Sequence, residues 1–317
     1  MATDAPYGAD GKHPLPADIA AAVQAIRDDR EHGASWLARA AARALLRAGE
    51  PRDDVPLAAW DAVMRAAAQE LVAARPSMAA VANAAASIWN AGQSERSPLA
   101  CRQAMLAMAA RLASQEEPAR QAMLAHAEKL IKGTVYTMSR SGTVEDILRQ
   151  LGQRHIIEGV IVAESRPGGE GVALARALAR SGLPVMVVAD TACGIFITEA
   201  ACVVLGADSL RADGSLVNKV GSYPLALAAR EAGNPVYVLC ETLKIAAPDF
   251  PLALEEMDAA EVLPGAEAGL TARNPYFDVT PAALIAAYIT EDGVLERDAI
   301  ARRAQTAGDA LARLRAR

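Results

Sequence analysis

The chain has 317 residues, of which 52% are hydrophobic and 22% are charged. These values are typical of a globular protein with a substantial core, and they exclude a largely disordered chain. The formal net charge of −6 argues against broad binding to nucleic acid or to anionic membrane surfaces, because both favour basic proteins. Aromatic residues make up only 4%, so we expect a core built from Ala, Leu and Val.

Cysteine and histidine spacing points to neither disulfide nor metal chemistry. The four cysteines form no CxxC pair, which favours free thiols in a reducing cytoplasm. The four histidines lack metal-ligand spacing, so we expect no metal and no other cofactor. The polar N-terminus has no apolar run of the signal-peptide kind, and no segment is long enough to span a bilayer. We therefore expect a cytoplasmic protein.

The first part of the chain is helical in pattern. Residues 1–16 are predicted to form a flexible arm. Six successive segments between residues 17 and 132 then repeat apolar residues at i, i+3 and i+4. Glycines fall at plausible helix ends, and prolines punctuate the connections. We predict a helical domain over residues 17–132.

At Gly133 the spacing of apolar residues changes from a helical pattern to a strand-like one. Short β-branched runs follow, at Thr134–Thr137, Ile157–Ala163, Pro184–Ala189, Cys202–Leu205 and Val236–Leu239. Helical segments separate most of them, at Thr143–Leu151, Gly171–Ser181 and Tyr223–Ala232. Strands that alternate with helices indicate an α/β domain with a mostly parallel sheet and right-handed crossovers. We assign residues 133–317 to this domain, with an irregular acidic stretch after Thr242 and a helical tail from Arg297.

Polar loops follow the strand-like runs, at the edge where open parallel sheets bind ligands. Ser139, Ser141 and Thr143 join the first run to a helix and can present hydroxyl and N–H groups to an oxyanion. Ordinary capping of that helix explains the same residues equally well. Capping and ligand contact do not exclude each other.

The loop Ser165–Gly171 also opens a helix and contains three glycines and Arg166. Free backbone N–H groups, the helix dipole and a guanidinium together suit a phosphate group. Alternatively, Arg166 pairs with Glu164 or Glu170 in a plain turn. The glycine spacing is not that of a dinucleotide fingerprint.

Asp190 ends another apolar run, and Asn218 and Lys219 follow a turn-rich segment. The aspartate is either a general acid or base at the sheet edge or the cap of the next helix. Asn218 and Lys219 suit recognition of a hydroxyl and a phosphate, but a cap and a surface charge remain open alternatives. Asp208 and Asp213 have the sequence context of turn residues.

At these motifs the chain resembles the superfamily that unites the alpha, beta and delta subunits of translation initiation factor 2B with two sugar-phosphate isomerases. Those enzymes act on methylthioribose 1-phosphate and ribose 1,5-bisphosphate. The resemblance covers nearly the whole chain and rests on ordered segments: EHGASWLARAAARAL, ARPSMAAVANAA, ESRPGGEG, GADSLRADGSLVNKVGSY and NPYFDVTPAALIAAYITEDG. The overall organisation is closest to that of ribose-1,5-bisphosphate isomerase.

The resemblance implies a helical N-terminal domain on a Rossmann-like C-terminal domain, which forms homodimers or larger homo-oligomers. It places the isomerases' catalytic cysteine at Ser139 and their aspartate at Asp190. It also implies a set of ligand contacts: His32, Gly33, Ala34, Arg75, Ser141, Arg166, Asn218 and Lys219. His32 stands where the isomerases have the arginine of an Arg-Gly-Ala segment.

Two functions follow from these observations. The first is an aldose–ketose isomerase that acts on a pentose phosphate. The second is a non-catalytic sensor of a sugar phosphate or nucleotide, which is similar to the regulatory subunits. The second gains weight from Ser139, because a serine hydroxyl needs an activating base whereas a thiolate does not.

Overall fold

The computed structural model describes residues 15–29, 32–50, 57–76, 78–95, 97–251, 254–265 and 267–316. The arm expected over residues 1–16 lies outside these ranges apart from its last two residues. Pro16 directly precedes the first helix.

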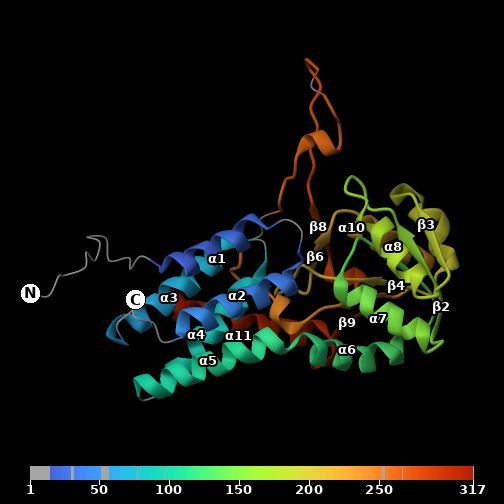
Figure 1. The fold of residues 1–317 in the computed structure, drawn as a ribbon. Helices are drawn as coiled ribbons and strands as arrows, with labels where there is room; N and C mark the ends of the chain where they lie inside the picture. Colours follow the sequence, from blue (N-terminus) through green and yellow to red (C-terminus); the bar gives the residue numbers. More distant parts are fainter. Residues whose placement is uncertain are drawn as a thin grey trace, which may run out of the picture.

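Six helices occupy the six segments whose apolar spacing predicted them. They are α1 (Ala17–Asp28), α2 (Ala34–Gly49), α3 (Leu57–Ala74), α4 (Ala79–Gln93), α5 (Pro98–Ser114) and α6 (Glu116–Leu130). Helix α4 lies in the middle of this bundle and packs against α2, α3 and α5 (Figure 1). Its buried positions are mostly alanine, and small side chains let neighbouring helices approach closely. The core of the bundle is built mainly from Ala and Leu as expected, but Met and Ile fill more of it than Val does.

The described residues of the second half form ten strands in two sheets. They are β1 (Gly133–Met138), β2 (Ile157–Ala163), β3 (Val185–Val188), β4 (Cys202–Leu205), β5 (Ser209–Leu210), β6 (Leu216–Lys219), β7 (Val236–Leu239), β8 (Phe277–Thr280), β9 (Ala287–Thr290) and β10 (Gly293–Leu295). Strands β5, β6 and β8 form a small antiparallel sheet. The last three strands fall in the stretch after Thr242 that we expected to be irregular.

The seven-stranded sheet has the order β10-β9-β7-β4-β1-β2-β3. All neighbours are parallel except β10, which runs antiparallel to β9. The chain therefore builds outward from β1 through β2 to β3, and then returns to place β4 on the other side of β1. This reversal between β1 and β4 is a topological switch point, where open α/β sheets form a crevice at the carboxyl ends of the strands.

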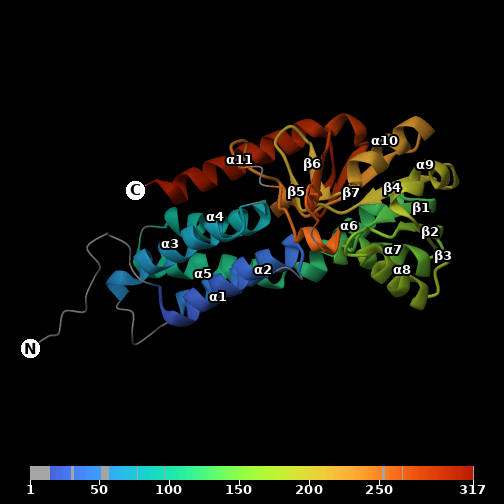
Figure 2. The ribbon, with the colours of Figure 1, turned by 90° about the horizontal axis from the view of Figure 1, so that it is seen from above.

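Helices cover both faces of this sheet (Figure 2). On one face lie α6, α7 (Gly142–Gln153) and α8 (Glu170–Arg180), whose apolar side chains share a core with β1 and β2. On the other face lie α9 (Cys193–Phe196), α10 (Ser222–Ala232) and the first half of α11 (Arg297–Arg315). Helix α8 starts close against β2, because a Cβ at Gly171 would lie 1.8 Å from the carbonyl oxygen of Ala163. Only glycine fits this position, which fixes the loop between the two elements.

Packing crosses the sequence position at which we predicted a domain boundary. Helix α6 precedes Lys132 but buries Met123 and Leu124 against the sheet. Helix α11 follows it but buries Leu311 and Leu314 in the helical bundle. A helix of 19 residues is about 28 Å long, so α11 reaches from the sheet to the bundle. The boundary itself stays a prediction.

Among the described residues, no helix is long and apolar enough to cross a membrane.

Candidate functional site

A cleft of about 710 Å³ opens at the switch point, between α2 and the carboxyl ends of β1 and β4. This volume is typical of small-molecule sites. The side chains and backbone that line it come from both halves of the chain. They include His32, Gly33, Ala34, Ser35, Trp36, Arg39, Glu116, Arg120, Ser139, Arg140, Ser141, Arg149, Asp208, Asn218 and Lys244.

The loop between β1 and α7 forms the first wall. Ser139 adopts a left-handed conformation with φ of 58°, and its N–H donates a hydrogen bond of 2.7 Å to the Ser165 hydroxyl. The Ser141 hydroxyl accepts from the N–H of Val144 and so caps α7. The first turn of α7 therefore faces the cleft with its N–H groups and its positive dipole end, which suits an anion.

Asp208 follows β4, lines the cleft and is half-buried. Burial raises the pKa of its carboxyl. The positive charges of Lys244, Lys219 and Arg75 oppose that rise, and the negative charge of Glu255 adds to it. A carboxyl whose pKa is raised in this way binds a proton more readily than a free aspartate does, which suits proton transfer.

Lys244 ends a short 3₁₀ turn (Thr242–Lys244) after β7 and is almost fully buried. Its Nζ donates a 2.6 Å hydrogen bond to the carbonyl oxygen of Ala207, next to Asp208. The lysine therefore fixes the turn that carries the aspartate and places a positive charge beside it. Asn218, on β6, donates through Nδ2 to the Ser222 hydroxyl at 2.8 Å and also lines the cleft.

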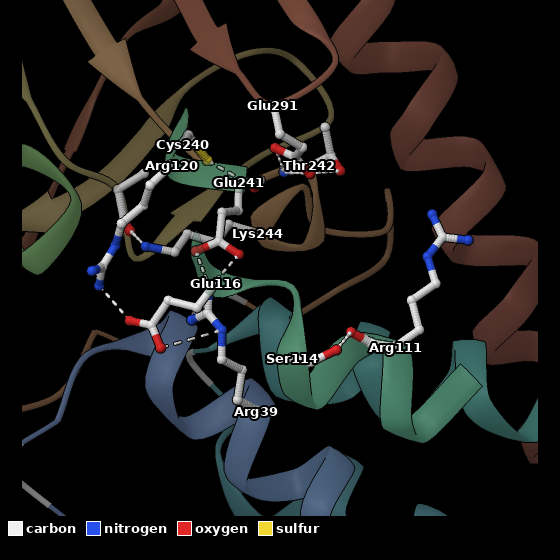
Figure 3. Close-up of polar contacts among 11 residues, drawn as sticks. Arg39, Arg111, Ser114, Glu116, Arg120, Cys240, Glu241, Thr242, Lys244 and Glu291 are labelled. Atoms are coloured by element: carbon white, nitrogen blue, oxygen red, sulfur yellow. Dashed lines mark hydrogen bonds and ion pairs between the residues drawn. The ribbon is translucent and has the colours of Figure 1, made fainter. Parts of the chain in front are cut away.

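An ion-pair network joins the helical half to the sheet at the second wall (Figure 3). The buried Arg39 of α2 donates through Nη2 to both carboxylate oxygens of Glu241, each at 3.0 Å. Its Nε lies 3.8 Å from the carboxylate of Glu116, which also pairs with Arg120 on the same helix. Because Glu241 follows β7, this network holds α2 against the carboxyl edge of the sheet.

His32 lies at the start of this wall, one residue before the N-cap of α2. Its backbone N–H and its Nδ1 each lie 2.8 Å from a carboxylate oxygen of Asp29. Its ring stacks on the indole of Trp36 with 3.8 Å between centroids.

Asp190 and Arg166, predicted from sequence as site residues, are not among the residues that line this cleft. Asp190 follows the edge strand β3, two strands away from β1, and is joined to the cleft wall only through Ser165, whose hydroxyl accepts the N–H of Ser139. Its two carboxylate oxygens accept the backbone N–H groups of Ser165 and Arg166, each at 2.7 Å. The aspartate thus ties down the loop after β2 rather than capping the following turn, and the Arg166 side chain is exposed.

Lys219 is also absent from the cleft lining, although its neighbour Asn218 is present. Its Nζ forms a 2.6 Å ion pair with Glu170 and lies 3.2 Å from the centroid of the Tyr276 ring. Burial raises the pKa of Glu170, but hydrogen bonds from Lys219 and Tyr276 outweigh it, and the pKa is lowered overall. Lys219 therefore affects the cleft only electrostatically: its positive charge lowers the pKa of Asp208.

Arg75 is buried beside the cleft and is held by protein groups. Its Nη1 donates to the carbonyl oxygen of Asp29 at 2.6 Å, and its Nη2 lies 3.3 Å from Glu255. It shares Asp29 with His32 and so supports the segment that enters α2.

The structure thus brings six predicted site residues together in one cleft: His32, Gly33, Ala34, Ser139, Ser141 and Asn218. Sequence reasoning missed the other charged groups there. Asp208 has the sequence context of a turn residue, and the strand order that marks it as a switch-point residue is a long-range property. Arg39 and Glu241 are 202 positions apart, and no local motif announces their pairing. Among the described residues, no group of three or more His, Cys, Asp or Glu side chains is arranged to hold a metal ion.

Comparison with known proteins places the chain among relatives that match most of its length. Residues 30–297 match the initiation factor 2 subunit family. A ribose 1,5-bisphosphate isomerase of Archaeoglobus fulgidus is 34% identical over 286 residues, which cover 88% of this chain and 90% of the relative. A putative translation initiation factor eIF-2B subunit 2-like protein of Pyrococcus horikoshii is 35% identical over 288 residues, with coverage of 89% and 97%. The crystal structure of the translation initiation factor eIF-2B of Pyrococcus horikoshii OT3 aligns with a TM-score of 0.74 at 31% identity, covering 89% of this chain and 98% of that one. The chain is therefore a member of the initiation factor 2 subunit family.

Proposed function

We propose that this chain binds a phosphorylated pentose in the switch-point cleft and acts on it as an aldose–ketose isomerase. The observation that carries the proposal is the meeting of Ser139, Asp208, Asn218 and Lys244 in one cleft. The isomerase relative, which matches nearly the whole chain, supports the same reaction class.

Isomerisation of an aldose to a ketose moves a proton between two neighbouring carbons and needs a group that takes it up and returns it. Asp208 suits this role because burial raises the pKa of its carboxyl. Lys244 is placed to stabilise negative charge that develops on the sugar oxygen during the transfer. The N-terminal turn of α7, with Ser141, is placed to hold a phosphate group. In this proposal Asp190 supports the neighbouring loop and does not contact the ligand.

A second function, a non-catalytic sensor of a sugar phosphate or nucleotide, is favoured by Ser139. Its backbone N–H is held by Ser165, and no described hydrogen bond joins its hydroxyl to a base. Without an activating base, such a hydroxyl is a poor proton acceptor near neutral pH. A sensor would use the same cleft for binding and leave the ligand unchanged.

Purified protein incubated with ribose 1,5-bisphosphate or with methylthioribose 1-phosphate discriminates between these functions. The isomerase proposal expects turnover of one of them, and a loss of at least about a hundredfold in kcat/KM for Asp208→Asn with ligand binding retained. Ser139→Cys is the matched gain-of-function variant, since a thiolate is a competent proton shuttle. Binding without turnover in both proteins would replace the enzyme by the sensor, and an absence of binding would remove both.

We also propose that the chain functions as a homodimer or larger homo-oligomer, as its resemblance to the family implies. Light scattering on the purified protein measures the mass of the assembly. A monomer of 33.1 kDa at all concentrations would contradict this.

A further inference from the structure

The two edges of the seven-stranded sheet differ in how they are protected. Strand β10 forms one edge with three residues, and Asp292 and Glu296 flank it directly. Strand β3 forms the other edge, and its four residues are all valine or methionine. Edge strands are normally short, charged or covered, because an open apolar edge pairs with other chains. The edge at β10 follows this rule, and the edge at β3 does not.

An exposed apolar surface surrounds β3. The side chains of Met186 and Val187 are 42% and 47% exposed. Ile195 of the neighbouring helix α9 is 71% exposed, the highest value for a large hydrophobic residue in the described part of the chain. These three residues define the β3–α9 surface. Because burial of such side chains is favourable and they lie close together on one end of the sheet, the surface has the properties of an interaction site.

The β3–α9 surface has almost no charge. Between Arg180 and Glu199 the sequence contains one charged residue, Asp190, although 22% of the whole chain is charged. Both carboxylate oxygens of Asp190 accept backbone N–H groups of the chain itself. Two copies of a chain with a net charge of −6 repel each other wherever acidic faces meet. A contact about a two-fold axis places one patch against itself, so a patch with so little charge suits a second copy.

The backbone of β3 also suits a two-fold contact. Strand β2 donates hydrogen bonds to the carbonyl oxygens of Pro184 and Val188. Since successive residues point their backbone groups to opposite sides of a strand, those of Val185 and Val187 face the free edge, where no described strand lies. In an antiparallel pair of two β3 strands, Met186 lies opposite its own copy. Val185 of each strand then exchanges hydrogen bonds with Val187 of the other.

We propose that the β3–α9 surface is the contact between two copies of this chain, which pair their β3 strands antiparallel about a two-fold axis. This inference rests on the homo-oligomer proposed above and names the surface that forms it. Residues 97–251 are described without a gap, so none of the remaining segments is continuous with this surface. Helix α1, which follows residues 1–14, lies at the opposite end of the molecule from β3 (Figures 1 and 2). These positions favour a second copy over residues 1–14 as the cover.

Two variants test the apolar contact and the strand pair separately. Ile195→Lys places a charge on an exposed position, which a monomer tolerates. Val187→Pro removes an N–H that faces the free edge, so pairing with β2 is kept and pairing with a second β3 is lost. By analytical ultracentrifugation we expect a wild-type assembly of at least twice 33.1 kDa. Each variant should raise the dissociation constant of the contact by at least about thirtyfold.

Val294→Lys on β10 is the matched control, because Val294 is 43% exposed on the opposite edge of the sheet. This variant should assemble like the wild type, and circular dichroism checks that all three variants are folded. Unchanged assembly in both β3–α9 variants would overturn this surface and leave the homo-oligomer intact. Loss of assembly in Ile195→Lys alone would overturn the strand pair. A wild-type monomer would overturn the contact between copies, whereas turnover of ribose 1,5-bisphosphate, measured separately, decides on the isomerase.

Discussion

The two walls of the cleft come from different kinds of structure. The sheet wall consists of the turns that follow β1 and β4, where backbone N–H groups, a cap and the half-buried carboxyl of Asp208 meet at the switch point. The helical wall consists of side chains from α2 and α6 that are held by an ion-pair network to the sheet. Topology brings the groups of the sheet wall together, whereas packing and charge between the two halves of the chain position the side chains of the helical wall.

The largest expected effect comes from breaking the link between the walls. Arg39 and Glu241 are both buried, so Arg39→Met leaves a buried carboxylate without its main partner. We expect a loss of about 3–5 kcal/mol in the free energy of unfolding, measured by chemical denaturation. Adding Glu241→Leu to the Arg39→Met variant should restore part of the lost stability, because the double variant no longer buries an unpaired carboxylate.

The matched control is a partly exposed pair. Arg303 and Asp292 form an ion pair of 2.8 Å with side chains 38% and 48% exposed. Arg303→Met should cost no more than about 1 kcal/mol. A similar small loss for Arg39→Met would mean that the buried network does not hold the walls together.

A pH effect is expected on the sheet side. Asp278 on β8 accepts the N–H groups of Gly221 and Tyr223 at the start of α10, and burial raises its pKa from 3.8 to about 6. The folded state therefore holds the proton on Asp278 to a higher pH than the unfolded state does. The contribution of the protonated Asp278 carboxyl to stability is complete below pH 3.8 and is lost as the pH rises through 6. The difference in unfolding free energy between wild type and Asp278→Asn should therefore fall by about 3 kcal/mol over this window.

Asp213 supplies a control of opposite sign. Burial raises its pKa, but hydrogen bonds from Ser215 outweigh that effect and lower it overall. The advantage of wild type over Asp213→Asn should therefore be present above pH 4 and disappear as the pH falls. Parallel profiles for the two variants would show that Asp278 is not the group that titrates.

An effect of intermediate size is expected below the helical wall. Ala84 of α4 is fully buried at the centre of the bundle. Ala84→Leu overpacks this position and should lower the free energy of unfolding by about 1–3 kcal/mol. Ala20→Leu on the exposed side of α1 should have little effect. Equal stability of the two variants would show that close packing of alanines does not support this wall.

The smallest expected effect compares two helix caps. Ser141 caps α7 in the cleft, and Ser97 caps α5 away from it. Substitution of either by alanine should cost about 1 kcal/mol of stability. Only Ser141→Ala should also weaken binding of ribose 5-phosphate, measured by calorimetry. Unchanged binding in that variant would remove the N-terminal turn of α7 from the site.

Local patterns were sufficient for much of the fold. The runs at β2, β4 and β7 predicted those strands with correct ends, because β-branched residues are concentrated there and small polar turns bound them. Strands β8, β9 and β10 were not predicted, although β4 and β7 are equally short; β8 and β9 pair with β6 and β7, which lie far from them in the sequence.

Local sequence patterns predicted the site less completely than the fold. Ser139 and Ser141 were identified because a loop between a strand and a helix is visible in the sequence. Whether Asp190 or Asp208 lies in the cleft depends on strand order. Both aspartates follow apolar strands, but only Asp208 follows the strand beside β1 at the switch point. No periodicity encodes that order, and the same holds for the contact between Arg39 and Glu241.

A crystal structure of the protein soaked with ribose 1,5-bisphosphate tests the central claim most directly. The account predicts ligand density in the switch-point cleft, with its sugar within hydrogen-bond distance of Asp208 and Lys244. Density that instead contacts Arg166 and Asp190 beyond β2 and β3, with the cleft unfilled, would contradict it.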